Sequence, residues 1–113
     1  MSESPTVWIS MEQCPEAAEH ILDAQADGHP CTCTLDRDNA DARRRVALHH
    51  TPPLPGYDRD EYPPAVCEEG GEGANVRYID PHDNRVAGSS MAHQIKKYPN
   101  GTKTQIKVAR KGR

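Results

Sequence analysis

Four cysteines in a short chain with few apolar residues constrain the fold more than any other feature of this sequence. The chain has 113 residues, of which 35% are hydrophobic and 4% are aromatic, and its mean hydropathy is -0.88. A chain of this size and polarity buries only a modest core, so covalent cross-links would supply part of its stability. We therefore predict two disulfides, each stabilising the fold by about 2–4 kcal/mol, and an oxidising compartment.

The pairing of these cysteines stays open at this point. Cys31 and Cys33 are only two positions apart, so a bridge between them would be badly strained and each should reach a different partner. Cys14 and Cys67 are the other two cysteines. A structural zinc site built from the thiolates and one histidine is the alternative. Zinc ligands usually occur as C-x(2–4)-C pairs, however, and the C-x-C spacing here is too tight.

The length fits one domain over 1–113, with a core over about 7–108 and a basic tail over 109–113. No apolar run reaches half of the roughly 20 residues that span a bilayer, so the pattern excludes a membrane protein. Segment 1–10 has neither the basic region nor the apolar stretch of a signal peptide. We expect a secreted, mature domain whose export signal is not in this sequence.

The net charge of -3 hides an asymmetry along the chain. Residues 1–90 hold all 17 acidic residues but only half of the 14 Lys and Arg residues. The other half lie in 91–113, which has no acidic residue, and the only further basic cluster is 43–45. A basic end on an otherwise acidic chain indicates contact with a polyanion, and a solvated cationic tail is the alternative.

The periodicity of apolar residues predicts a small mixed α+β domain. Proline at position 15 and glycine at position 28 bound the first predicted helix, in which Ala17, Ile21 and Ala24 recur at helical spacing. Further helices are predicted over 40–50 and 85–97. Strands are predicted over 7–9, 31–35, 74–79 and 102–108, with one more before the Gly-rich turn 70–73. We expect about three helices packed on a short antiparallel sheet.

Two clusters of polar residues stand where metal chemistry could occur. Segment 58–61 packs three carboxylates and Arg59 into four residues, which is tolerated when the acids bind a divalent cation; a solvated acidic loop is the alternative. Asp83 and Asn84 follow a predicted β-turn-β and open the third helix, where Asn84 could instead serve as the N-cap. An acidic strand, a hairpin and a helix with a neutral oxygen ligand form the outline of a ββα metal finger.

Four blocks of sequence, in their order and spacing, resemble the NucA/NucB deoxyribonuclease family. The blocks are GYDRDEYP, CEEGGEGANVRYI, DNRVAGSS and HQIKKYPNGTK, and the upstream segments HILDAQADGH and TCTLDRDNADARRR fit as well. The resemblance runs from about Val7 to Val108. It implies a small, mostly secreted bacterial DNase that needs a metal, carries a ββα metal finger and cleaves DNA with little sequence preference.

The resemblance also implies roles for individual residues. Asp60 and Glu61 match the acidic pair of the family's DRDE segment. We favour Asp60 as the general base, with Glu61 as the alternative. The neighbouring acids should raise the pKa of whichever carboxylate serves as the base. Asn84 matches the family's metal-ligand Asn, and Asp60 is a second candidate ligand. No acid follows Asn84, so the further ligand that relatives outside this family have is missing or replaced, by His93 or Gln94 at best. A site held largely by water and phosphate is therefore expected.

The implied mechanism is hydrolysis of a phosphodiester with one Mg²⁺ or Mn²⁺, which neutralises the phosphate and the departing 3′ oxygen. Arg59 is the third candidate catalytic residue, as a phosphate clamp, and a salt bridge to a nearby acid is its alternative role. The candidates for contact with DNA are all basic: Arg43, Arg44, Arg45, Arg85, Lys96 and Lys97. We expect these contacts to read the DNA backbone rather than its bases.

The cysteines also compare with the family. Cys33 and Cys67 fall at positions where relatives carry cysteines, whereas Cys14 and Cys31 look like extras in this sequence. The resemblance therefore implies the pairs Cys33–Cys67 and Cys14–Cys31.

The chain departs from the family pattern at two places. Val86 stands where Gly is usual, and Met91 or Ser90 where an aromatic residue is common; neither is expected to touch the chemistry. We predict a monomeric, nonspecific DNA endonuclease with DNA as its partner, no membrane contact and a protein inhibitor as a further partner. The nuclease domain of a bacterial toxin is one alternative. A catalytically weak DNA-binding or inhibitor-like domain is another, because the second helix ligand is missing.

Overall fold

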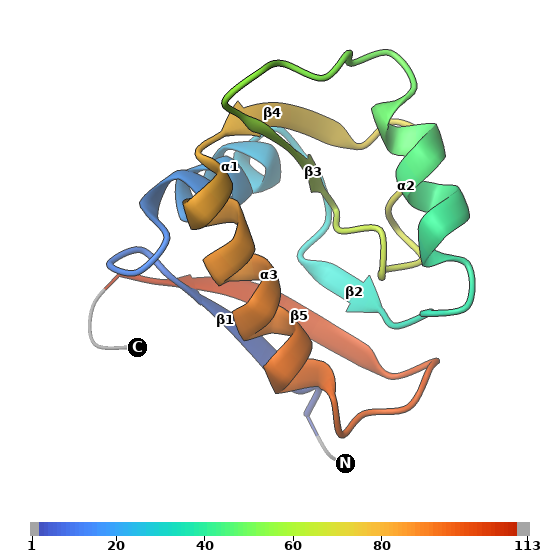
Figure 1. Cartoon of the computed structure of the whole chain (residues 1–113). Coiled ribbons are helices and arrows are strands. Elements are labelled where there is room, and N and C mark those ends of the chain that lie inside the picture. Colours follow the sequence, from blue (N-terminus) through green and yellow to red (C-terminus); the bar gives the residue numbers. More distant parts are fainter. Residues whose placement is uncertain (1–2, 111–113) are drawn as a thin grey trace.

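The computed structural model describes residues 3–110 and has the predicted order of elements, β-α-β-α-β-β-α-β (Figure 1). The elements are β1 Thr6–Ser10, α1 Pro15–Ala26, β2 Thr32–Thr34, α2 Ala40–Leu48, β3 Asp58–Tyr62, β4 Asn75–Ile79, α3 Pro81–Ile95 and β5 Lys103–Ala109. The α+β class is confirmed. Of the predicted basic tail, Lys111 and Arg113 lie outside the described residues. None of the helices described is both long and apolar enough to cross a bilayer.

The strands form two sheets, which corrects the expectation of a single antiparallel one. β5 is the centre of a three-stranded sheet in the order β1-β5-β2, parallel to β1 and antiparallel to β2. β3 and β4 pair with each other alone, antiparallel, with Asp60 opposite Arg77. The periodicity of a segment shows that it is a strand but not which strand it pairs with, so the parallel pairing of the first and last strands was not predicted.

The core lies where α1 and α3 pack against both sheets. Figure 1 shows α3 crossing the three-stranded sheet, the β3–β4 pair above it and α2 beside β3 at the right. The predicted apolar face of α1 is buried, and the largest buried side chain of the core is Tyr62 of β3. The main members of the core are Val7, Ile9, Ala17, Ala18, Ile21, Ala24, Leu35, Tyr62, Ile79 and Ile106.

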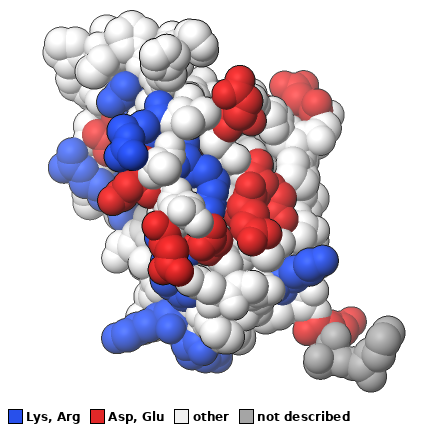
Figure 2. All heavy atoms as spheres, turned by 90° about the vertical axis from the view of Figure 1, so that its right-hand side faces the viewer, with Lys and Arg blue, Asp and Glu red and all other residues white. Residues whose placement is uncertain are grey.

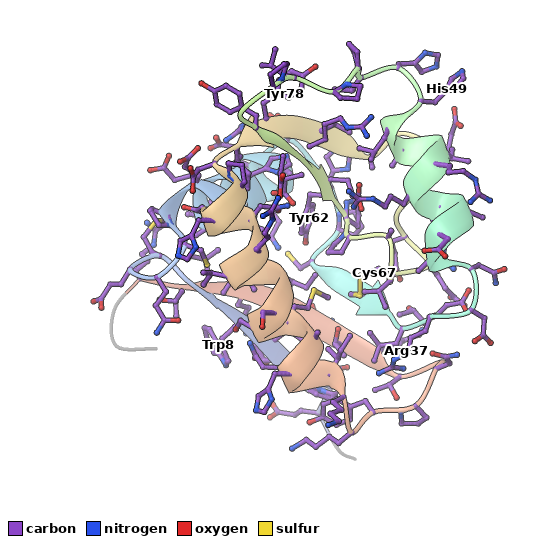
Figure 3. All side chains as sticks on the ribbon, viewed as in Figure 1. Trp8, Arg37, His49, Tyr62, Cys67 and Tyr78 are labelled. Carbon is purple, nitrogen blue, oxygen red and sulfur yellow. A yellow bond between two sulfur atoms is a disulfide. The ribbon has the colours of Figure 1, made fainter. Side chains whose placement is uncertain are left out.

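Gln25 interrupts the apolar stripe of α1, and its side chain forms a hydrogen bond with the buried Tyr62. Its Nε2 donates to Tyr62 Oη at 2.9 Å and to the Ile106 carbonyl at 3.0 Å. Tyr62 Oη in turn donates to the Pro30 carbonyl at 2.7 Å, and Figure 3 shows this side chain in the interior. Burial raises the pKa of Tyr62 to about 12, so the hydroxyl keeps its proton and remains a donor. These bonds satisfy polar groups that would otherwise destabilise the core.

The disulfide Cys33–Cys67 is confirmed. It joins β2 to the segment that follows β3, with 4.9 Å between the two Cα atoms (Figure 3). The same two segments are bonded through their backbones, since Glu68 N donates to the Thr34 carbonyl at 2.8 Å. A cross-link that closes 34 residues stabilises the fold by about 3–4 kcal/mol, chiefly by restricting the unfolded chain.

The predicted second pair, Cys14–Cys31, is wrong, because both cysteines are free. Cys14 is buried immediately before α1, and Cys31 is exposed beyond the other end of this helix. Twelve helical residues rise by about 18 Å, far more than the roughly 7 Å that a disulfide allows between Cα atoms. Cys14 Sγ instead donates to the Ser10 carbonyl at 3.3 Å. Burial, supported by the charge of Asp83, raises the pKa of Cys14 and keeps it a thiol.

Helix α3 begins four residues before its predicted start. Asp80 is the N-cap, accepting a hydrogen bond from Asp83 N at 3.0 Å, and Pro81 occupies the first turn. Asn84 is therefore not the N-cap but lies within the first turns, where its own N donates to the Asp80 carbonyl. Its side chain is thereby available for another role.

Candidate active site

A pocket of about 200 Å³ brings together four of the predicted site residues from three elements. Arg44 comes from α2, Asp60 and Glu61 from β3, and Asn84 from α3. On α3 the lining residues 84, 87, 88 and 91 recur at the spacing of one helix face. Most of the other lining residues are apolar, so the polar cluster shares one hollow with apolar side chains.

Asp60 is held from behind by a buried histidine. Its Oδ2 lies 2.7 Å from His20 Nδ1, and His20 Nε2 donates to Asn75 Oδ1 at 2.9 Å. The His20 side chain is fully buried, whereas that of Asp60 is 22% exposed. The sequence prediction missed His20. Its position between Ala17 and Ala24 on the apolar stripe was the available signal, because a polar side chain on a buried face needs a polar partner.

Glu61 is a buried carboxylate that is only half satisfied. Its side chain is 7% exposed, and Oε1 accepts from Arg44 Nη1 at 3.1 Å. Oε2 is buried and has no hydrogen-bond partner among the described residues. Burial is the main cause that raises the pKa of Glu61; the Asp60 charge adds to it and Arg44 opposes it. A buried carboxylate oxygen without a donor is an atom to which a cation can bind.

Asp58 orients Asn84 at the rim of the pocket. Asn84 Nδ2 donates to Asp58 Oδ2 at 3.1 Å, and Arg85 Nη2 lies 3.4 Å from Asp58 Oδ1. The amide nitrogen of Asn84 is thus bound to a fixed carboxylate. Its amide oxygen therefore remains a candidate for the neutral metal ligand.

Gln94 and His93 do not join this cluster, which corrects both as candidate metal ligands. Gln94 Oε1 accepts from Trp8 N at 2.9 Å and its Nε2 donates to the Trp8 carbonyl at 2.7 Å, so the side chain fastens α3 to β1. His93 is exposed, and nine helical residues place it about 13 Å along the axis from Asn84. Within residues 3–110 no group of three or more His, Cys, Asp or Glu side chains could hold a metal ion.

Arg43 is not available to DNA, contrary to the prediction. Its side chain is only 15% exposed, and its Nη2 forms an ion pair with the Asp36 carboxylate. Its Nη1 donates to three backbone carbonyls, those of Asp36, Ala65 and Cys67. This guanidinium therefore fastens the segment after β3 to α2.

Arg59 is also removed from the catalytic set. Arg59 does not line the pocket that Asp60 and Glu61 share, although its side chain lies on the same side of β3 as that of Glu61. Its Nη1 donates to the Thr51 carbonyl at 2.9 Å and so holds the loop before β3. Among the described residues it forms no salt bridge, so the alternative role expected for it is not observed.

A groove continues from the pocket along α3. A second hollow of about 490 Å³ shares Glu61, Pro64, Gly88 and Met91 with the first and extends to Lys96. Met91 therefore lines both hollows and lies in the same pocket as Asp60 and Glu61. Lys96 is exposed at the far end, whereas Lys97 lies over the Tyr98 ring at 5.4 Å.

Basic residues do not form a continuous field on the α2 side of the molecule. Figure 2 shows acidic and basic side chains interspersed on this face. Lys103 and Lys107 are exposed on β5, where they alternate with the buried Thr104 and Ile106 and so point away from the core. On the face that Figure 2 shows, the basic residues are therefore not gathered into one surface.

Two comparisons with known proteins bear on this site. The family profile described as deoxyribonuclease NucA/NucB matches residues 13–107, which include every polar residue of the pocket. This chain belongs to the NucA/NucB deoxyribonuclease family. The DNA-entry nuclease of Bacillus subtilis (strain 168) is 52% identical over 103 residues, which are 91% of this chain and 70% of that protein. As a member of the NucA/NucB family, the chain is a nonspecific DNA nuclease.

Proposed function

We propose that this NucA/NucB nuclease hydrolyses DNA with one bound Mg²⁺ or Mn²⁺ and Asp60 as its general base. The observation that carries the proposal is the buried Glu61 Oε2, which has no hydrogen-bond partner in the described part of the chain and lines the same pocket as Asp60 and Asn84. Charged oxygen ligands without donors are what a hard divalent cation needs.

The residues of the pocket fit such a cation. Glu61 offers one carboxylate oxygen and Asn84 one amide oxygen, and Mg²⁺ is commonly held by one or two carboxylates together with water and substrate phosphate. A cation bound there would neutralise the scissile phosphate and the departing 3′ oxygen.

Asp60 is suited to accept a proton from water. Oδ2 is engaged by His20, which leaves Oδ1 as the atom that can face the partly open pocket. In the proposed step this carboxylate takes one proton from water, whose oxygen attacks phosphorus while the bond to the 3′ oxygen breaks.

Three basic side chains are proposed to bind the DNA backbone. Arg44 is 53% exposed beside Glu61, Arg85 is 74% exposed next to Asn84, and Lys96 lies at the end of the groove. The guanidinium groups suit bidentate contact with phosphate. Lys97 and Arg45 are exposed and stay predictions for weaker, outer contacts.

The test is cleavage of supercoiled plasmid with Mg²⁺, Mn²⁺ or chelator. We expect cleavage with a metal and none with chelator, and Asp60→Asn should lower kcat by about 10²–10⁴-fold. Asp23→Asn is the matched control, because this exposed carboxylate pairs with Arg77 away from the pocket. If the wild-type protein bound DNA but failed to cleave it with every metal tested, the alternative of a weak DNA-binding domain would replace the enzyme.

The Cys33–Cys67 disulfide supports function outside the reducing cytoplasm. We propose that the domain works after export, as a monomer and under the control of a protein inhibitor. Size-exclusion chromatography tests the monomer, and capture of a tight-binding partner from the source organism tests the inhibitor.

A further inference from the structure

His20 joins three elements behind the pocket. It projects from α1, faces Asp60 on β3 through Nδ1, and faces Asn75 on β4 through Nε2. An amide oxygen can only accept, so Nε2 donates to Asn75 and one proton lies between Nδ1 and Asp60 Oδ2. Both ring nitrogens are therefore used, and the plane of the ring is fixed from two sides.

We infer that His20 is a positioning residue for the hydrolysis, holding Asp60 so that its Oδ1 faces the attacking water. This inference rests on the proposed role of Asp60. A short β-strand carboxylate can rotate about two side-chain bonds, and a fixed donor on one oxygen removes this freedom. The family's acidic base on β3 would thus depend on a helix outside the ββα segment.

His20 does not act as the base itself. Its side chain is fully buried, and Asp60 stands between the ring and the pocket, so water in the pocket cannot reach either ring nitrogen. A direct proton transfer from the attacking water needs hydrogen-bond distance. The only route from His20 to the reaction runs through Asp60.

The helix that holds His20 is itself anchored to α3. Asp83, one residue before the metal-ligand candidate Asn84, accepts from Glu16 N at 3.0 Å and from Ala17 N at 2.9 Å. Glu16 and Ala17 lie one turn before His20 on α1. The hydrogen bonds of Asp83 therefore fix α3, which carries Asn84, relative to α1, which carries His20. They thereby fix the two sides of the pocket relative to each other.

The test compares three substitutions of His20 that differ in which contact they can replace. Asparagine places an amide nitrogen near the position of Nδ1 and can still donate to Asp60. Glutamine reaches toward Asn75 instead, and leucine makes neither contact. We expect His20→Leu to lower kcat by about 100-fold while KM and the metal concentration for half-maximal cleavage stay unchanged. His20→Asn should recover at least about 10-fold of this loss in kcat, and His20→Gln should recover less.

Cleavage is followed with a quenched fluorescent oligonucleotide over a series of Mn²⁺ concentrations. His50→Leu is the control for loss of an exposed imidazole, and near-ultraviolet circular dichroism confirms that each variant is folded. If His20→Leu does not fold, Asn75→Ala removes only the outer contact and should lower kcat by about 10-fold.

Three results would overturn the positioning role. The first is a wild-type kcat in folded His20→Leu or, if that variant does not fold, in Asn75→Ala. The second is an equal kcat for folded His20→Asn and folded His20→Leu. The third is a kcat of His20→Leu that returns to the wild-type value with excess metal. In each case wild-type cleavage and the Asp60→Asn defect would remain. Failure of the proposed function differs, because the wild-type protein would then show no metal-dependent cleavage.

Discussion

At the scale of single residues, Glu61 is where stability and activity oppose each other. A carboxylate with one oxygen unsatisfied and nearly all of its surface buried destabilises the folded state in its charged form. Functional sites commonly carry such groups, because a ligand supplies the missing interaction when it binds. The same oxygen that weakens the metal-free fold is the one proposed to bind the cation.

Replacing Glu61 by glutamine should therefore stabilise the metal-free protein at neutral pH. Burial raises the folded-state pKa of Glu61 above its unfolded value, so the folded state binds the carboxyl proton more tightly. The stability of the wild type therefore falls as pH rises from the unfolded-state pKa to the folded-state pKa. Glu61→Gln removes the fall. In chelator we expect it to exceed the wild-type stability by about 1 kcal/mol at pH 7, with the gap closing near pH 4.

Metal should reverse this order. Mn²⁺ or Mg²⁺ should raise the Tm of the wild-type protein, because a ligand that binds only the folded state stabilises it, and should leave the Tm of Glu61→Gln unchanged. Thermal denaturation by circular dichroism measures both effects. A variant less stable than the wild type in chelator at pH 7 would show that the Arg44 ion pair outweighs the burial of the charge.

At the scale of elements, the N-termini of α1 and α3 cap each other. Cys14 makes no side-chain capping bond for α1, and Asp83 of α3 supplies the acceptor instead. In return Glu16 Oε1 accepts from Asp80 N at 3.2 Å. Helix N-termini favour negative charge, so each helix stabilises the other and fixes its orientation.

Asp83→Ala should accordingly cost about 2–3 kcal/mol, because one buried and one partly buried amide of α1 lose their acceptor at once. The free energy of unfolding in urea is the measurement. Asp23→Asn should change it by less than about 0.5 kcal/mol, since this ion pair is exposed. A loss from Asp83→Ala no larger than that of this control would contradict the capping role.

Gly88 gives a second prediction for α3. Glycine inside a helix destabilises it, and a Cβ at this position would meet nothing within 4 Å. Gly88→Ala should therefore stabilise the protein by about 0.5–1 kcal/mol.

Gly88→Leu should fill the groove shared by the two hollows and raise KM for DNA by about 10-fold or more. Unchanged KM in a folded Gly88→Leu would show that DNA does not use this groove.

At the scale of the whole molecule, one disulfide, one buried thiol and one exposed thiol replace the two predicted bridges. A thiol reagent should label Cys31 alone in the native protein, Cys14 and Cys31 after denaturation, and all four cysteines only after reduction. Mass spectrometry gives the counts. Labelling of all four without reduction would refute the Cys33–Cys67 bridge, and no labelling without reduction would restore the Cys14–Cys31 pair.

Reduction should also weaken DNA binding. The bridge holds the segment after β3, and this segment supplies Pro64, Ala65 and Val66 to the wall of the groove. We expect Cys67→Ser to cost about 2–4 kcal/mol of stability and to raise KM more than it lowers kcat. Parallel urea and cleavage measurements check this, and a larger effect on kcat would contradict it.

The sequence alone determined the parts of this protein that depend on neighbours along the chain. Apolar spacing and turn residues predicted the order of the eight elements, and the resemblance to the family pointed to Asp60, Glu61 and Asn84 as site residues. The order of the elements is confirmed because helix and strand periodicity and turns are local interactions. The start of α3 was missed because the expected cap, Asn84, competed with the true one, Asp80.

Only the tertiary structure decided which distant groups meet. His20 and Asp60 are 40 residues apart, Glu16 and Asp83 are 67, and Trp8 and Gln94 are 86. Arg43 resembles a DNA contact until its neighbours are known, and Cys14 resembles a disulfide partner until the length of α1 separates it from Cys31. A side chain's role depends on which polar groups it satisfies once water is excluded, and packing brings those groups together from anywhere in the chain.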